Sequence, residues 1–172
     1  HALVRRQRQM CIRDRPKAAL VDHAKLVKGS FAGHFLCFNF NKNDRLYMTL
    51  PLYHSTGLIL GWAASLRSGC PNVIKSKFSA SDFWNDVKKY NVNKFIYVGE
   101  LCRYLMNLPP SEGDKENPIT QISGNGLRPD IWESFQKRFN INKIVEIYGA
   151  TEAVGMTINS CLLYTSDAAD EP

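Results

Sequence analysis

Residues 148–152, Tyr148-Gly149-Ala150-Thr151-Glu152, are the stretch that decides the fold and the candidate site of this chain. They follow the apolar-rich run 144–147, which is typical of a buried strand that ends at a glycine turn. In an open α/β sheet, ligands bind at the carboxyl ends of the strands. A threonine hydroxyl there can donate to a phosphate oxygen, and a glutamate carboxylate can hold Mg²⁺ directly or through water. The pattern indicates a nucleotide site, and a plain turn with a solvated acid is the alternative.

A second glycine-rich turn lies upstream, in the stretch 122–128 (ISGNGLR). It follows a short predicted strand and precedes a helix predicted from Pro129 to Phe139. Glycines at such a turn let the backbone approach a flat ligand closely. This turn therefore supports the nucleotide interpretation of residues 148–152.

Helices and strands alternate along the chain, which predicts an α/β fold with a mostly parallel sheet flanked by helices. No run reaches the roughly 18 apolar residues of a membrane-spanning helix, and the turn-rich segment 109–118 is expected to be a surface loop. The expected strands are 18–21, 46–50, 72–74, 94–98, 119–123 and 143–147, and the expected helices are 23–38, 56–66, 79–90, 99–108 and 129–139.

Six motifs in order resemble those of the fatty acid transport protein and very-long-chain acyl-CoA synthetase family, within the acyl-adenylate-forming, or AMP-binding, superfamily. The resemblance runs from Pro16 to about Asn159. The FSASDFW and GELCRYL stretches indicate this branch, and the others are superfamily-wide or belong to the glycine-rich turn. The motifs are 16–19 (PKAA), 50–55 (LPLYHS), 77–84 (KFSASDFW), 98–105 (VGELCRYL), 124–128 (GNGLR) and 148–152 (YGATE).

The resemblance implies an enzyme that joins a fatty acid to AMP and then transfers the acyl group to coenzyme A, with ATP, Mg²⁺ and coenzyme A as cofactors or co-substrates. It implies that Thr151 contacts the α-phosphate, that Glu152 holds Mg²⁺ and that Tyr148 packs along the adenine. The backbone of Gly124, Asn125 and Gly126 would line the other side of the adenine. The nucleotide-binding residues implied are Lys17, Gly124, Asn125, Gly126, Tyr148, Gly149, Ala150 and Thr151.

Two further residues have roles only through this resemblance. Lys17 matches the lysine that closes the phosphate-binding loop, but the Thr/Ser/Gly-rich run that precedes this lysine in the family is absent here. His54 would line the space between the adenylate and acyl pockets, and a structural histidine after a strand is the alternative. Glu100 and Arg103 lie three residues apart on one predicted helix, so a surface ion pair is expected.

The two ends of the chain read as foreign sequence. One set of codons for 161–171 (CLLYTSDAADE) has an antisense strand that, shifted by one base, encodes the RRQRQMCIRD of 5–14. Protein selection does not produce such a relation, and a sequencing adapter does. We therefore expect residues 1–15 and 160–172 to be adapter-derived and residues 16–159 to be part of an AMP-binding domain. Such a fragment would be inactive by itself.

Removing these ends takes away five arginines and four acidic residues, so the net charge of +6 falls by about one. The basic cluster that would have suggested nucleic acid disappears with them. Cys37, Cys70 and Cys102 have no metal-ligand spacing, so buried, reduced thiols are expected.

The partners implied are fatty acid, ATP and coenzyme A, with no nucleic acid. Membrane association would come through regions outside this segment, in the endoplasmic reticulum, plasma membrane or peroxisome, with a cytosolic active site. Chain-length preference and oligomeric state have no signal in the sequence. Two alternatives stay open, namely a fatty-acid uptake protein whose adenylation is incidental and another adenylate-forming ligase.

Overall fold

A six-stranded sheet forms the centre of the molecule, in a computed structural model that describes residues 20–151 and 156–160. The strand order is β2-β1-β3-β4-β5-β6, and every pair is parallel except β5 with β6. The predicted mostly parallel sheet is confirmed. The strands are β1 (Leu46–Met48), β2 (Asn72–Ile74), β3 (Lys94–Val98), β4 (Gln121–Asn125), β5 (Lys143–Gly149) and β6 (Met156–Asn159).

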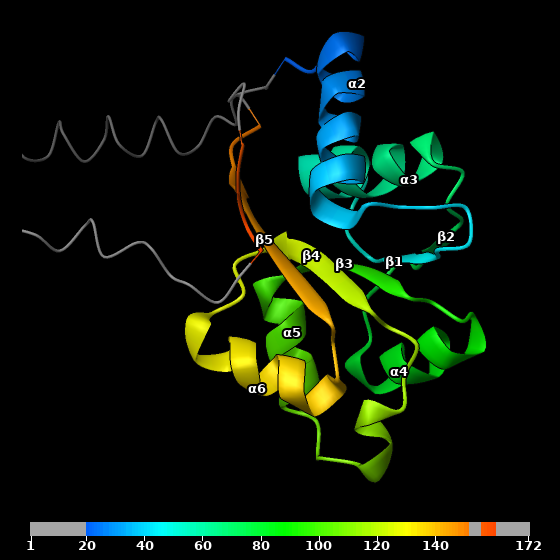
Figure 1. Cartoon of the computed structure of the whole chain (residues 1–172), viewed down its shortest axis with the longest axis vertical. Helices are drawn as coiled ribbons and strands as arrows, with labels where there is room; N and C mark the ends of the chain where they lie inside the picture. Colours follow the sequence, from blue (N-terminus) through cyan, green and yellow to red (C-terminus); the bar gives the residue numbers. More distant parts are fainter. Residues whose placement is uncertain (1–19, 152–155, 161–172) are drawn as a thin grey trace, which may run out of the picture.

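Helices cover both faces of this sheet, as parallel strands require. In Figure 1, α2 and α3 lie above the sheet and α4, α5 and α6 lie below it. The helical segments are α2 (His23–Ala32), η1 (Gly33–Phe38), η2 (Thr56–Ala63), α3 (Ala64–Arg67), α4 (Ala80–Lys89), α5 (Gly99–Met106), η3 (Glu112–Lys115) and α6 (Pro129–Phe139). Segments η1 and η2 are π-helical, and η3 is a 3₁₀ turn.

Two apolar cores result, one on each face of the sheet. The larger core lies beneath α4, α5 and α6 and is rich in aromatic rings, among them Phe83, Phe95 and Phe135, all fully or nearly fully buried. The smaller core lies under η1 and η2 and includes Phe38, Met48 and Ile96. The three cysteines expected to be buried lie in these cores, and burial raises the pKa of the Cys37 and Cys70 thiols to about 11.

Local sequence explains most element boundaries. The Ser79 hydroxyl caps α4 by accepting from the Asp82 backbone N–H at 3.4 Å. Pro129 occupies the first turn of α6, where its missing N–H costs nothing. Helix α5 ends at Met106, two residues before the predicted end at 108 and shortly before Pro109 and Pro110, which cannot continue a helix.

Several predicted strands differ from the structure. Leu20 and Val21 form no strand, because no neighbouring strand pairs with them and Leu20 is 93% exposed; Ala18 and Ala19 lie outside the described residues. Strand β1 ends at Met48 instead of Leu50, because its neighbour β2 ends at Ile74, the residue that pairs with Met48. Strand 119–123 begins and ends two residues later, at Gln121 and Asn125.

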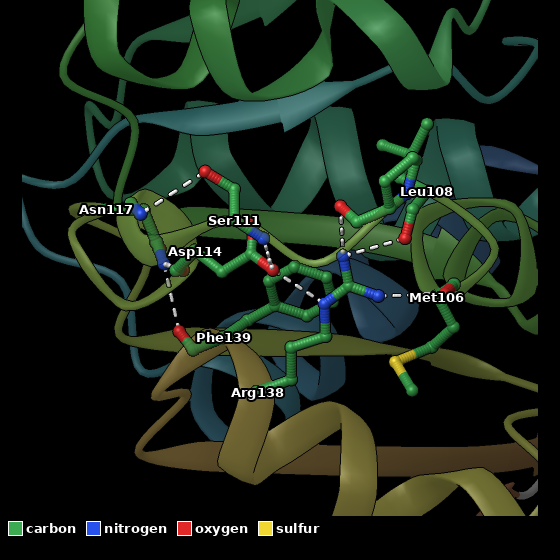
Figure 2. A network of polar contacts seen from close by, with 9 residues as sticks. Met106, Leu108, Ser111, Asp114, Asn117, Arg138 and Phe139 are labelled. Carbon is green, nitrogen blue, oxygen red and sulfur yellow. Dashed lines mark hydrogen bonds and ion pairs between the residues drawn. The ribbon is translucent and has the colours of Figure 1, made fainter.

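The end of α6 opposite the site is fixed by a polar network centred on Arg138 (Figure 2). The Arg138 guanidinium pairs with Asp114 at 2.7 Å and donates to the carbonyls of Met106, Leu108 and Pro109. Both charged side chains are largely buried, at 15% and 12% exposed. The predicted surface loop 109–118 is therefore anchored to the domain rather than free.

Candidate functional site

The candidate site lies where β4 and β5 end, side by side at one edge of the sheet (Figure 1). Gly124 of β4 pairs with Glu146 of β5, so the two strands run in parallel into the glycine-rich turn and the 148–151 segment. The parallel register therefore brings together two motifs that are more than twenty residues apart in the sequence. This juxtaposition was expected from the sequence as a consequence of a parallel sheet.

The turn after β4 requires glycine for close packing. Gly126 has a positive φ of 82°, and a Cβ added at Gly99, the first residue of α5, would lie 1.7 Å from the Gly126 carbonyl oxygen. A Cβ added at Gly126 would meet only the Gly99 nitrogen, at 3.8 Å. The turn thus touches α5 on one side, while open space remains beside Gly126 in the described part of the chain, as a flat ligand requires.

Glu146, in the middle of β5, holds this turn from beneath. Its carboxylate accepts the backbone N–H groups of Gly126 and Leu127, both at 2.9 Å, and the Tyr97 hydroxyl at 2.6 Å. Burial raises the pKa of the Glu146 carboxyl, against the opposite effect of these hydrogen bonds. Burial, together with the nearby Glu146 charge, also raises the pKa of Tyr97.

Tyr148 stands free at the end of β5. Its side chain is 81% exposed although it is a large aromatic residue, whereas Ile147 beside it is only 6% exposed. Gly149 and Ala150 are exposed as well. An exposed ring next to an open glycine turn can stack on a planar base, which is the role that the sequence resemblance gave to Tyr148.

Thr151 is held by two segments that are distant in the sequence, namely the residues just before η2 and helix α2. Its hydroxyl lies 3.1 Å from the Ser55 hydroxyl, and the Lys25 ammonium of α2 donates to its carbonyl. Ser55 belongs to the LPLYHS motif, so this contact joins that motif to the YGATE motif. The Thr151 hydroxyl, which is predicted to contact the phosphate, is therefore held in one orientation and does not rotate freely.

His54 lies one residue before Ser55, at the entrance to η2. It is exposed, and its Nδ1 accepts the Thr56 backbone N–H at 3.2 Å. Because the neighbouring Ser55 contacts Thr151, His54 lies close to the part of the site that contains Thr151. Its predicted lining role stays a prediction, since this hydrogen bond also suits a structural histidine.

The described residues include most of the predicted site. Gly124 and Asn125 end β4 and Gly126 begins the turn after it, while Tyr148 and Gly149 end the neighbouring β5 and Ala150 and Thr151 follow it. Lys17 and Glu152 lie outside the described residues. The predicted Glu100–Arg103 pair forms at 2.6 Å on the exposed face of α5 and takes no part in the site.

Three residues in the site were missed by the sequence analysis: Glu146, Ser55 and Lys25. Only Glu146 had a usable signal, because a carboxylate inside an Ile/Val-rich strand must find donors once it is buried. In residues 20–151 and 156–160, no group of three or more His, Cys, Asp or Glu side chains could hold a metal ion. The predicted Mg²⁺ ligand, Glu152, is not among these residues.

An open parallel sheet with two glycine turns at one edge defines the class of the protein as a nucleotide-binding α/β domain. The family model described as "AMP-binding enzyme" matches residues 15–172, and the chain belongs to that family.

The chain is similar to long-chain fatty acid transport proteins. It is 48% identical over 137 residues to mouse long-chain fatty acid transport protein 6, covering 80% of this chain and 22% of that protein. It is 42% identical over 144 residues to human long-chain fatty acid transport protein 3, covering 84% of this chain and 21% of that protein. The chain thus spans about a fifth of the length of these relatives.

Solved structures share the fold. ATP-bound MatB from Rhodopseudomonas palustris matches with a TM-score of 0.73 at 22% identity, over 85% of this chain and 29% of that chain. A malonyl-CoA ligase with methylmalonyl-CoA and AMP bound matches with a TM-score of 0.65 at 20% identity, over 80% of this chain and 30% of that one. At these identities the likeness confirms the α/β fold alone.

Proposed function

We propose that this chain is part of an ATP-dependent fatty acid–CoA ligase. The observation that supports this most is the meeting of three motifs at one sheet edge: the glycine turn after β4, the segment after β5, and the LPLYHS motif through the Ser55–Thr151 contact. Membership of the AMP-binding family and similarity to fatty acid transport proteins support a fatty acid as the acyl substrate.

In the proposed reaction, a fatty acid carboxylate oxygen attacks the α-phosphorus of ATP, and pyrophosphate leaves. The coenzyme A thiolate then attacks the acyl carbonyl, and AMP leaves. Since the carboxylate and the triphosphate repel each other, positioning and charge neutralisation must supply most of the acceleration.

Each site residue has one task in this scheme. The Thr151 hydroxyl donates to an α-phosphate oxygen, and Tyr148 and the Gly124–Gly126 turn enclose the adenine. Lys17 would face the outer phosphates, and His54 would separate the nucleotide from the acyl chain. A bound Mg²⁺, held by Glu152, would supply charge neutralisation to the phosphates.

The test is the adenylation half-reaction in the full-length protein, followed by pyrophosphate exchange with palmitate. Glu152→Gln removes a charged ligand and keeps the shape, so exchange should fall by about 10²–10³ and recover in part at high Mg²⁺. Glu133→Gln is the matched control, because Glu133 pairs with Lys137 on the exposed face of α6. An unchanged exchange rate in Glu152→Gln would make Glu152 a turn residue only.

Substrate choice separates the proposal from other adenylate-forming ligases. Exchange should be supported by palmitate or a C24 acid and not by amino acids. Exchange driven by an amino acid would instead assign the protein to another branch of the superfamily.

The second candidate function is fatty-acid uptake, which the names of the relatives favour. Cells that express the Glu152→Gln protein decide between the two. Uptake that falls together with adenylation supports the ligase as the driving activity. Full uptake by an adenylation-dead protein would make transport the primary function.

We further propose that residues 16–159 form part of a larger AMP-binding domain and that residues 1–15 and 160–172 derive from an adapter. The coding locus should then read a Thr/Ser/Gly-rich loop before Pro16 and continue past Asn159. A locus that encodes RRQRQMCIRD at that place would refute the idea.

We place the intact protein at a membrane, with a cytosolic active site, because its substrate is a lipid. None of the described helices is long and apolar enough to cross a bilayer. Fractionation of cells that express the intact protein tests this proposal and separates the endoplasmic reticulum, plasma membrane and peroxisome.

A further inference from the structure

We propose that Glu146 is a positioning residue for ATP, which fixes the glycine turn against which the adenine binds. The inference rests on the proposed function and adds a residue that the sequence motifs did not single out. Glu146 would act through the backbone of residues 126 and 127 and would not itself touch the reacting atoms.

The geometry places three donors around one carboxylate. Oε2 accepts the Gly126 N–H at 2.9 Å, and Oε1 accepts both the Leu127 N–H at 2.9 Å and the Tyr97 hydroxyl at 2.6 Å. The three donors come from the turn after β4 and from β3, whereas Glu146 lies on β5. The Glu146 side chain therefore links β5 both to β3 and to the turn that follows β4.

The same molecule contains a contrasting case. Asp86 also accepts a buried tyrosine hydroxyl, from Tyr47 at 2.9 Å, but it has a cationic partner in Lys75 at 2.9 Å. Among the described residues, no cation lies within ion-pair distance of Glu146. Its negative charge is compensated by the N–H groups of the turn instead, and such charge-assisted hydrogen bonds are stronger and more directional than neutral ones.

This arrangement suits a nucleotide site better than it suits a core. An Ile or Val at position 146 would continue the apolar run of β5 without burying a charge. The carboxylate instead holds the backbone N–H of Gly126, a residue with a positive φ whose carbonyl lies against Gly99 of α5. A turn fixed before the ligand arrives binds it with a smaller entropic loss.

The decisive variant is Glu146→Gln in the full-length protein. Glutamine has one carbonyl oxygen and one amide NH₂, so whichever way it is placed it points a donor at the N–H of Gly126 or Leu127. We expect the Kd of ATP, measured by calorimetry, and the KM for ATP to rise by roughly 10- to 100-fold. The KM for the fatty acid should stay unchanged, which a general loss of structure would not produce.

Two tyrosine variants form a matched pair. Tyr97→Phe removes one of the three donors to Glu146 and should weaken ATP binding by up to about tenfold. Tyr47→Phe removes the equivalent hydrogen bond to Asp86, from β1, which does not adjoin β4 or β5, and should leave ATP binding unchanged. Tyr97→Phe also decides the matter if Glu146→Gln does not fold.

Three results would overturn the inference while leaving the ligase proposal intact. They are unchanged ATP binding in folded Glu146→Gln and Tyr97→Phe proteins, an equal loss for ATP and fatty acid, and an equal effect of Tyr47→Phe. A wild-type protein that neither binds ATP nor exchanges pyrophosphate would instead refute the proposed function, and this inference with it.

Discussion

At the scale of single residues, Thr151 owes its position to side chains from distant parts of the chain. Its hydroxyl meets the Ser55 hydroxyl at 3.1 Å, and its carbonyl accepts from Lys25. For Thr151 to donate to a phosphate oxygen, as proposed, its own oxygen must accept the hydrogen bond from its partner, so that its proton stays available. The Ser55 hydroxyl can donate this hydrogen bond and hold the Thr151 rotamer.

Replacing Ser55 by alanine should therefore weaken adenylation without unfolding the protein. One neutral hydrogen bond is worth about 0.5–1.5 kcal/mol, so we expect pyrophosphate exchange in the full-length protein to fall by up to about tenfold. Ser134→Ala is the control, since the Ser134 hydroxyl only donates to a carbonyl of its own helix. Equal exchange rates for Ser55→Ala and wild type would show that Thr151 does not need this partner.

Sequence reasoning identified residues whose chemistry is visible in the motif itself, and missed those whose importance comes from contacts. Thr151 and the glycines of 124–126 were proposed as site residues because a hydroxyl or a missing Cβ after a strand has a direct chemical meaning. Ser55 looked like an ordinary motif residue, and its contact with Thr151 spans 96 positions. Lys25 likewise looks like an ordinary helix lysine in the sequence, and only the fold shows that it donates to the Thr151 carbonyl.

At the scale of elements, the start of α5 and the turn after β4 are packed backbone against backbone. The Gly99 Cα faces the Gly126 carbonyl so closely that no side chain fits between them. Both elements begin where a strand of the parallel sheet ends, so their contact fixes the height of the candidate adenine site above the sheet. This interlock is a property of the two elements together and not of either sequence stretch alone.

Gly99→Ala should separate these two elements. The added methyl group would lie 1.7 Å from the Gly126 carbonyl oxygen, which belongs to backbone and cannot rotate away. We expect a loss of about 1–3 kcal/mol in stability and weaker ATP binding, measured by thermal melting and calorimetry. Gly113→Ala is the control, because its nearest neighbours are side-chain atoms 3.7 Å or more away. Full ATP affinity in Gly99→Ala would show that the turn can move without consequence.

The opposite end of α6 depends on Arg138, whose contacts are drawn in Figure 2. Arg138→Leu leaves the Asp114 carboxylate largely buried without its cation, along with three unpaired carbonyls. Because breaking a buried pair in this way is costly, we expect a destabilisation of about 3–5 kcal/mol. Thermal melting and faster amide exchange in residues 107–117 of the full-length protein would show it.

Arg128→Leu provides the comparison, since Arg128 pairs with Asp130 on the surface with both side chains more than half exposed. Exposed pairs contribute little, so melting and exchange should stay close to wild type. Similar losses in the two variants would mean that the loop is not held by the Arg138 network.

The predicted elements agreed with the structure where the apolar periodicity of a segment is bounded by residues that start or end a helix. Helix 129–139 begins at a proline and ends before an asparagine with positive φ, and it was placed without error. Strand β6 was missed because it has only four residues, and it pairs antiparallel with residues 146–149 of β5, unlike the other strands of the sheet. The change from α to π geometry at Gly33 was also not predicted from the sequence.

At the scale of the whole molecule, one outer surface is more apolar than a free domain would tolerate. Several large apolar residues of the helix predicted from 23 to 38 are exposed: Val27 (48%), Phe31 (44%), Phe35 (58%) and Leu36 (56%). Leu66 of α3 is exposed too, and Arg67 stacks on Phe31 at 3.4 Å. Clustered apolar exposure of this kind marks a surface that another part of a protein normally covers.

Residues 16–159 expressed alone should therefore be mostly insoluble or molten. A largely parallel sheet folds slowly through long-range pairing and exposes aggregation-prone surfaces while it does so. ATP affinity should be no better than about millimolar, because the Thr/Ser/Gly-rich phosphate loop that precedes Lys17 in the family would supply many of the hydrogen bonds to the phosphates. Polar substitutions at Val27 and Phe35 should raise the solubility of the segment but not its ATP affinity. Micromolar, Mg²⁺-dependent ATP binding to a monomeric, cooperatively melting segment would contradict both expectations, and it would move the domain boundary inside this chain.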